Sequence, residues 1–270
     1  MSPRRPVVAF LTDFGAGSEY VGALHAVVAR ECRDADRIDL AHDIPAGDVR
    51  GGALVLARLV TLIPGAIVVA VVDPGVGTTR RAAAVAAEDG GALVGPDNGL
   101  LAPAARALGA SRAVELAPPP ADAPATFHGR DLFAPAAARL AAGAALSDLG
   151  TPFAPGDLVA PDLPRPVVAE GELAATVVAI DTFGNLELLA GPADLDAAGF
   201  TRGDRIFAAV TDRRHPATVA RAFDDVARKG MLVHIDAHGQ VALAVNGGSA
   251  AQRLGARLGQ TVTFGRWPLG

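Results

Sequence analysis

The chain has 270 residues, half of them apolar, a formal net charge of −5 and a single cysteine, Cys32. The negative charge argues against nucleic acid as a partner because no basic stripe can meet phosphates, and one cysteine permits neither an internal disulfide nor a cysteine zinc cage. No apolar run reaches the ~18 residues of a membrane helix, and the run before Thr12 is too short for a secretory signal, so we expect a soluble, cytoplasmic protein without membrane contacts.

Strand and helix patterns alternate along the first 160 residues. Residues 7–11 form a short apolar run typical of a buried strand, and residues 20–29 carry apolar side chains at helical spacing. Asp48 is the expected N-cap of a helix that ends near residue 62. Further strands are predicted over residues 66–72, 82–87 and 92–94, and further helices over residues 101–108 and 132–142. This alternation predicts an N-terminal α/β domain, residues 1–160, around a largely parallel or mixed sheet.

The composition changes in the middle of the chain. Residues 151–166 are rich in Pro, Asp and Gly and have little periodicity, which is typical of a domain linker. Strand-like runs follow at residues 174–180, 205–210, 232–235, 241–245 and 261–264. Several short strands with few helices predict a smaller C-terminal domain, residues 161–270, that resembles a β-barrel.

The densest group of reactive side chains is Asp-Pro-Gly-Val-Gly-Thr-Thr-Arg, residues 73–80, directly after a predicted strand. A carboxylate at the carboxyl end of a strand in an open α/β sheet lies where ligands usually bind. The proline and glycines can turn Arg80 back toward Asp73. The alternative is a connecting turn with a surface ion pair. The segment is no phosphate-binding P-loop, because the Gly-Lys-Ser/Thr ending is missing.

A second group, Thr-Phe-His-Gly-Arg-Asp at residues 126–131, precedes a predicted helix. Because the pKa of histidine is near neutrality, His128 is suited to proton transfer; the alternative is that Thr126 or Asp131 merely caps the helix. Residues 95–99 and 181–185 are typical of turns. The histidines include one His-x-x-x-His pair, His234 and His238, but it falls across the end of a predicted strand, so we expect no metal site.

Taken in order, these groups resemble the adenosine-forming S-adenosyl-L-methionine (SAM) hydrolases, or SAM hydroxide adenosyltransferases, which are related to the bacterial fluorinase and chlorinase. The matching segments are residues 12–15, 20–22, 73–80, 95–101, 126–131, 181–185 and 246–251. The resemblance implies that SAM is the substrate, that no cofactor is needed, and that the protein is a homotrimer. It also implies a substrate held between the N-terminal domain of one subunit and the C-terminal domain of its neighbour.

The resemblance assigns roles to individual residues. Asp73, Arg80 and His128 would direct a water molecule at the ribose 5′-carbon, with neutral His128 as the preferred general base and Asp73 as the alternative. The substrate contacts would be Asp13 to the ribose hydroxyls, Asp181 and Asn185 to the methionine ammonium and carboxylate with Phe183 beside them, Phe223 to the adenine face, and the backbone of Val245 and Gly247 to the adenine edge.

Two rival functions are open to the same motifs. A halide transferase would make 5′-halo-5′-deoxyadenosine. The resemblance implies that halide-using relatives carry hydroxyl-bearing residues at the positions of Asp73, Val76, His128 and Gly129, so this chain lacks the hydroxyl groups that would bind a halide. A non-catalytic protein that binds SAM or adenosine would not need the three catalytic residues together. One departure from the family pattern is Ser18, where many relatives carry Asp.

Overall fold

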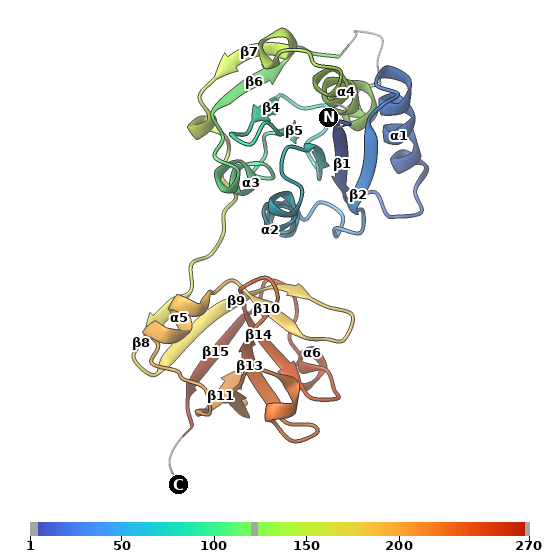
Figure 1. Cartoon of the computed structure of the whole chain (residues 1–270). Coiled ribbons are helices and arrows are strands. Elements are labelled where there is room, and N and C mark those ends of the chain that lie inside the picture. Colours follow the sequence, from blue (N-terminus) through green and yellow to red (C-terminus); the bar gives the residue numbers. More distant parts are fainter. Residues whose placement is uncertain (1–4, 120–123, 268–270) are drawn as a thin grey trace. The chain divides into compact units, whose positions relative to one another are not determined.

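Figure 1 shows the chain as a computed structural model that describes residues 5–119 and 124–267. It divides into two compact units, Met1–Asp162 and Leu163–Gly270. The predicted boundary lies between residues 160 and 161. Both predicted domains include a few residues outside the described ranges.

The N-terminal unit is built on a mixed seven-stranded sheet of strand order β2-β1-β3-β5-β4-β6-β7. Its strands β2, β1, β3 and β5 run parallel, whereas β4 runs antiparallel to both β5 and β6, and β7 antiparallel to β6. The α/β class with a mixed sheet is therefore confirmed. The strands are β1 Val7–Thr12, β2 Asp36–Ala41, β3 Ile67–Val71, β4 Ala82–Ala86, β5 Ala92–Pro96, β6 Arg112–Leu116 and β7 Gly150–Phe153.

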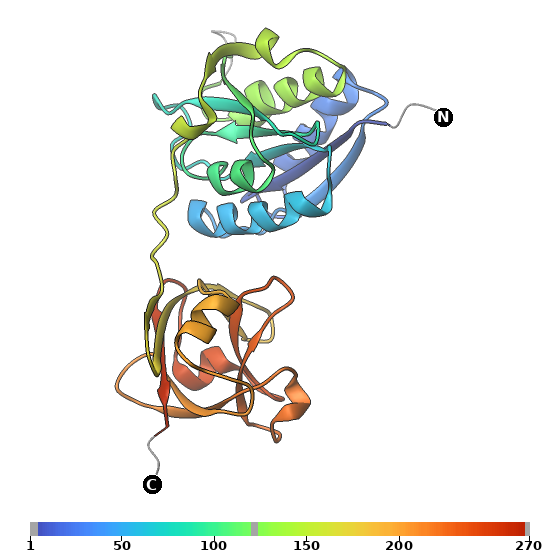
Figure 2. The ribbon, with the colours of Figure 1, turned by 60° about the vertical axis from the view of Figure 1, so that its left-hand side comes forward.

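Helices cover both faces of this sheet. Helices α1 and α4 pack on one face, and α2 and α3 pack on the other, as Figures 1 and 2 show. The central strand β3 is buried along its whole length, because its alternate side chains enter two separate cores. The helices are α1 Glu19–Glu31, α2 Val49–Leu59, α3 Ala102–Ala107 and α4 Ala134–Ala141, the last preceded by a π-helical turn, Gly129–Phe133.

Three strands of this unit, β2, β6 and β7, were not predicted. The edge strand β2 is largely exposed and carries charged residues, so it lacks the apolar run that marks a buried strand. Residues 151–153, which the sequence analysis assigned to a linker, belong to edge strand β7. An edge strand tolerates Pro152, which the composition alone indicated as a breaker. The predicted linker is therefore wrong at its start.

The C-terminal unit is a closed β-barrel, as expected. Seven strands form a ring in the order β10-β14-β13-β12-β11-β15-β9, closed by the pairing of β9 with β10, and β8 extends the sheet beside β9. Closure leaves no free edge within the ring. The elements are β8 Val167–Ala169, β9 Glu172–Ile180, β10 Leu186–Leu188, α5 Pro192–Ala197, β11 Arg205–Ala209, β12 His215–Val219, β13 Met231–Ile235, β14 Val241–Val245, α6 Ala250–Leu254 and β15 Thr261–Arg266.

The helices are short. Within the described ranges the longest, α1, has 13 residues, and a bilayer-spanning helix needs about 20. None of the described helices could cross a membrane.

Candidate active site

Asp73 and Arg80 form a buried ion pair at the carboxyl end of β3. The turn between them is closed by backbone hydrogen bonds from Val76 N–H to the Asp73 carbonyl, 3.2 Å, and from Thr78 N–H to the Gly75 carbonyl, 3.1 Å. Arg80 Nη2 lies 2.5 Å from Asp73 Oδ2, and Nε lies 3.1 and 3.0 Å from the two carboxylate oxygens. The side chains are only 10% and 4% exposed. The alternative of a surface ion pair is therefore wrong.

His128 joins this pair from the start of the π-helical turn. Arg80 Nη2 lies 2.8 Å from His128 Nδ1. A guanidinium can only donate hydrogen bonds, so Nδ1 must accept, and the neutral ring carries its proton on Nε2. Burial and then the charge of Arg80 lower the pKa of His128, although Asp73 and Asp131 act against this. The neutral imidazole is thus the form that fits this site.

This tautomer limits what His128 can do. Its one lone pair in the plane of the ring is occupied by Arg80, so the imidazole can offer its Nε2–H as a donor but can take up a proton only if that contact breaks. The Asp73 carboxylate lines the adjoining cavity and has lone pairs beyond those that Arg80 occupies. The geometry therefore favours Asp73 over His128 as the acceptor of a proton from water.

The capping alternative for residues 126–131 does not hold. His128 is itself at the N-cap position of the helical turn, and no side chain among the described residues caps it. Asp131 instead pairs with Arg130, whose Nε lies 2.7 Å from Asp131 Oδ1. The motif serves to bring His128 to Arg80.

A cavity of about 290 Å³ lies beside these residues. The motifs at residues 12–15, 73–80 and 126–131 meet there, although they are far apart in the sequence. Gly129 is tightly enclosed, since a Cβ there would lie 3.3 Å from Leu24 and from Phe127. The lining residues are Asp13, Phe14, Tyr20, Val71, Asp73, Val76, Thr126, Phe127, His128 and Gly129.

Sequence reasoning gave no role to the aromatic side chains of this cavity. Phe14, Tyr20 and Phe127 contact one another edge to face, with ring centroids 4.9 to 6.0 Å apart. Each belongs to one of the segments that match the family pattern, and this position in the sequence could have marked them as site residues. They supply an apolar part of the cavity wall.

Asp13 follows β1 on the same sheet edge. Its Oδ2 accepts a hydrogen bond from Gly47 N–H at 2.8 Å, and Gly47 has a positive φ of 73°. Ser18, the departure from the family pattern, caps α1 by accepting a hydrogen bond from Tyr20 N–H at 3.3 Å. Ser18 thus has a structural task of its own.

The C-terminal unit has a separate cavity of about 850 Å³. Asp181 organises one side of it, because Oδ1 accepts hydrogen bonds from Phe183 N–H and Asn185 N–H, both at 2.9 Å, and Oδ2 accepts one from Asn185 Nδ2 at 2.8 Å. These residues form the β9–β10 hairpin turn, so the turn interpretation and the site interpretation hold together. All six predicted substrate contacts of this unit line the cavity: Asp181, Phe183, Asn185, Phe223, Val245 and Gly247.

Asn246 and His234 were missed in this unit. Asn246 Nδ2 donates to the carbonyls of Phe223 and Val226, at 3.1 and 2.9 Å, and so joins two walls of the cavity. The His234 ring lies 5.7 Å from that of Phe223. Asn246 lies in one of the segments that match the family pattern. His234 lies in β13, outside those segments, so nothing in the sequence marked it as a site residue.

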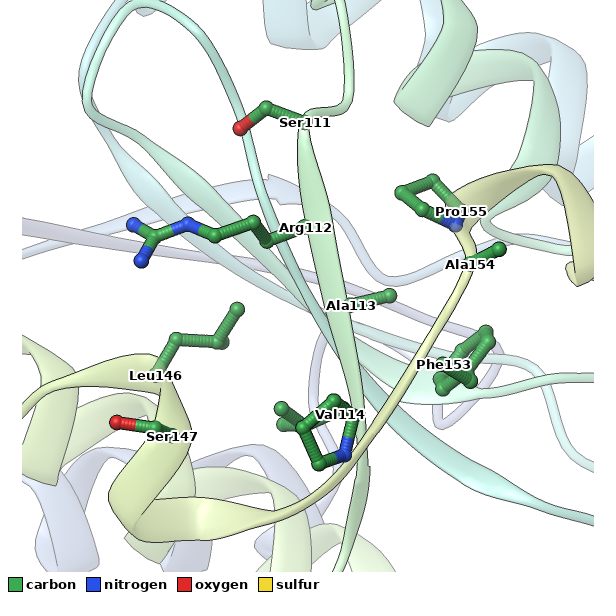
Figure 3. Close-up of a pocket in the computed structure, with 10 residues that line it drawn as sticks. Ser111, Arg112, Ala113, Val114, Leu146, Ser147, Phe153, Ala154 and Pro155 are labelled. Atoms are coloured by element: carbon green, nitrogen blue, oxygen red, sulfur yellow. The ribbon is translucent and has the colours of Figure 1, made fainter.

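Two other features carry no predicted site residue. Glu187, Asp236 and His238 each place one donor atom within 4.8 Å of the others, a spacing that could hold a metal ion, although Asp236 Oδ1 already accepts hydrogen bonds from His238 N–H and Gln240 N–H. Figure 3 shows a second cavity of the N-terminal unit, about 300 Å³, between β6, β7 and residues 146–147. None of the described residues that line it carries a carboxylate or an imidazole for acid–base chemistry.

Comparison with known proteins places this geometry in a family. Residues 8–150 match the SAM hydroxide adenosyltransferase N-terminal domain, and residues 175–263 match the corresponding C-terminal domain. The chain is 50% identical to the (R)-S-adenosyl-L-methionine hydrolase of Salinispora tropica, covering 94% of this chain and 95% of the relative. It is 40% identical to the enzyme of the same name from Thermus thermophilus, covering 96% and 98%.

More distant proteins match over similar lengths. The fluorinase of Actinopolyspora mzabensis is 28% identical, covering 97% of this chain and 98% of the relative. The crystal structure of a conserved protein from Thermotoga maritima has a TM-score of 0.88 at 33% identity, covering 96% and 100%. The identities are thus higher to the proteins named as hydrolases than to the one named as a fluorinase.

Proposed function

This chain belongs to the SAM hydroxide adenosyltransferase family, and we infer that it hydrolyses S-adenosyl-L-methionine to adenosine and L-methionine. The observation that carries this conclusion is the hydrogen-bonded group of Asp73, Arg80 and His128 beside a cavity, in a protein half identical to a named hydrolase. The relatives' names specify the (R) form of the substrate. We propose the same preference here.

In the proposed reaction, one water molecule attacks the ribose 5′-carbon in line with the bond to sulfur. The water oxygen forms the new C–O bond, the C5′–S bond breaks, and its electron pair goes to sulfur, which leaves as the neutral thioether of methionine. Asp73 takes the proton that the water loses and passes it to solvent. The Nε2–H of His128 donates to the water oxygen and so orients it for attack.

The electrostatics of the pair suit a cationic substrate. An unpaired arginine would repel the sulfonium, but at 2.5 Å the charge of Arg80 is balanced by Asp73. Val76 and Gly129 line the cavity without a hydroxyl group, which favours water over a halide ion.

The remaining site assignments are also proposals. Asp13 would bind the ribose hydroxyls, Asp181 and Asn185 the methionine end, and Phe223 with the backbone of Val245 and Gly247 the adenine. Phe183, 77% exposed in the C-terminal unit, would lie beside the methionine. From the family resemblance we also propose a homotrimer in which a neighbouring subunit completes the site. Equilibrium sedimentation tests the trimer.

We further propose that the enzyme needs no cofactor and works in the cytoplasm. Activity that persists after dialysis against EDTA would support the first statement, and cell fractionation tests the second. Both rest on the family resemblance and composition.

The deciding experiment is incubation of the purified protein with chirally pure (R)- and (S)-SAM in oxygen-18 water. Hydrolysis places the label in the 5′-oxygen of adenosine, with faster release from the (R) form. Parallel reactions with chloride or fluoride test the halide alternative, since a 5′-halo-5′-deoxyadenosine product would replace adenosine. Binding of SAM without release of adenosine would leave only a non-catalytic binder.

A further inference from the structure

Two buried polar side chains that have no role in the proposed reaction lie next to the turn that carries Asp13. Thr12, the last residue of β1, is 0% exposed, and His42, just after β2, is 5% exposed. Thr12 Oγ1 lies 2.8 Å from His42 Nδ1 and also accepts a hydrogen bond from Phe14 N–H at 3.2 Å. Burying such groups is costly unless their hydrogen bonds are satisfied, so this pairing constrains both residues.

His42 holds the same turn at a second point. Its carbonyl oxygen accepts a hydrogen bond from Gly15 N–H at 2.7 Å. The side chain of His42 therefore fixes the start of the turn at Thr12, and its backbone fixes the end at Gly15. The two residues between them, Asp13 and Phe14, both line the N-terminal cavity.

The donors and acceptors behind this turn form a consistent chain. Asp39 Oδ1 lies 2.7 Å from His25 Nε2 and 2.9 Å from His42 Nε2, although the latter contact is off the axis of a regular hydrogen bond. Burial raises the pKa of Asp39, but the interactions of its carboxylate with His42 and His25 outweigh it and leave that pKa lowered. The ionised carboxylate thus favours a proton on Nε2 of His42.

The tautomer of His42 then determines whether the Thr12 hydroxyl donates or accepts the hydrogen bond between them. With the proton on Nε2, Nδ1 accepts the hydrogen of the Thr12 hydroxyl. The lone pairs of Oγ1 stay available for Phe14 N–H. Only a side chain that donates once and accepts once completes this arrangement, and Asp13 is the next residue in the chain.

We propose that Thr12 and His42 are positioning residues that orient the turn of Asp13, so that its carboxylate faces the ribose hydroxyls of the substrate. Gly47 N–H holds Asp13 Oδ2 at 2.8 Å and fixes the side chain, while Thr12 and His42 fix the backbone that carries it. The inference rests on the proposed function for the identity of the ligand as a ribonucleoside.

The test compares Thr12→Val, which removes the hydroxyl and keeps the branched shape, with Thr12→Ser, which keeps the hydroxyl. Calorimetry measures the binding of adenosine and of 2′,3′-dideoxyadenosine, which lacks both ribose hydroxyls. We expect Thr12→Val to weaken adenosine binding about tenfold, as for the loss of one hydrogen bond. Binding of the dideoxy compound should be unchanged, and Thr12→Ser should stay within about twofold of the wild type.

Several results would overturn the proposal. They are unchanged adenosine binding in Thr12→Val, an equal loss for both nucleosides, or a wild type that binds adenosine no better than the dideoxy compound. In combination with Asp13→Asn, the effect of Thr12→Val should largely disappear, and full additivity contradicts an action through Asp13.

A measurement on the wild type keeps the proposal testable if Thr12→Val does not fold. The nitrogen-15 chemical shifts of His42 should show Nε2 protonated and Nδ1 unprotonated at neutral pH, and a protonated Nδ1 contradicts the proposed chain. A protein that binds adenosine through its hydroxyls but does not hydrolyse SAM would refute the proposed function alone. Normal hydrolysis with an unaffected Thr12→Val variant would refute the positioning role alone.

Discussion

The cavities of the two units are built in different ways. In the N-terminal unit, charged side chains from separate segments converge at the ends of parallel strands. Their contacts join residues that are far apart in the sequence, as with Arg80 and His128. In the C-terminal barrel, local turns supply the walls, such as the hairpin in which Asp181 binds the backbone of Phe183 and Asn185. This difference fits the proposed roles, in which the first unit carries the reacting groups together with Asp13, and the second unit carries the remaining substrate contacts.

The largest expected effect is that of Asp73→Asn. The amide cannot take a proton from water and leaves Arg80 without its counter-charge, so we expect turnover to fall about 10³- to 10⁴-fold. Adenosine release under saturating SAM measures this. Asp97→Asn is a matched control, because Asp97 is also buried and paired with an arginine, Arg81, at 2.9 Å, but does not line the cavity. Equal losses in both variants would remove the special role of Asp73.

His128→Ala should have the next largest effect, with turnover about 10²-fold lower, because the water loses its orienting donor. In the wild type the neutral imidazole is the active form and its pKa is lowered by burial and by Arg80. The rate should therefore be constant at neutral pH and fall only below pH 6.5, the ordinary pKa of histidine. The pH profile of kcat/KM shows whether this acid limb is missing in His128→Ala.

A matched control exists for that profile. His215 also has a pKa lowered by burial and by nearby arginines, but it lines neither described site cavity. His215→Ala should keep the acid limb of the wild type. If the pH profile changed equally in His128→Ala and His215→Ala, the fall in rate at acid pH would be due to general unfolding and not to His128.

Phe223→Ala tests the second unit and should affect binding more than chemistry. Loss of aromatic stacking on a base is worth about 1–3 kcal/mol, so KM for SAM should rise roughly tenfold while kcat changes little. Phe223→Tyr keeps the aromatic face and serves as control. A large fall in kcat with unchanged KM would contradict the division between the two units.

Ser18→Ala should have the smallest effect on activity. Removing an N-cap costs about 1 kcal/mol of unfolding free energy, which chemical denaturation can measure, whereas turnover and KM should stay as in the wild type. Ser18→Asp keeps a capping side chain and should recover the stability. A clear rise in KM for Ser18→Ala would mean that the serine contacts substrate after all.

Regular elements with strong apolar patterns could be predicted, and weakly patterned ones could not. Strand β3 is buried on both sides and was recognised from its apolar run, and the cap at Asp48 marked the start of α2. Edge strands β2 and β7 were missed because exposed, charged or proline-containing strands lack that pattern. The order of the motifs along the chain identified the family, because each short motif alone is weak evidence and the ordered set is specific.

The sequence by itself determined the two-part architecture and the family and predicted which side chains react, since these follow from local patterns and their order. Only the tertiary structure decided how the reactive groups share their hydrogen bonds. The contact of Arg80 with His128 Nδ1 joins residues 48 positions apart and sets the tautomer of the ring, and the contact of Thr12 with His42 sets the turn of Asp13. Such contacts depend on which strand ends meet, and hence on the folded sheet.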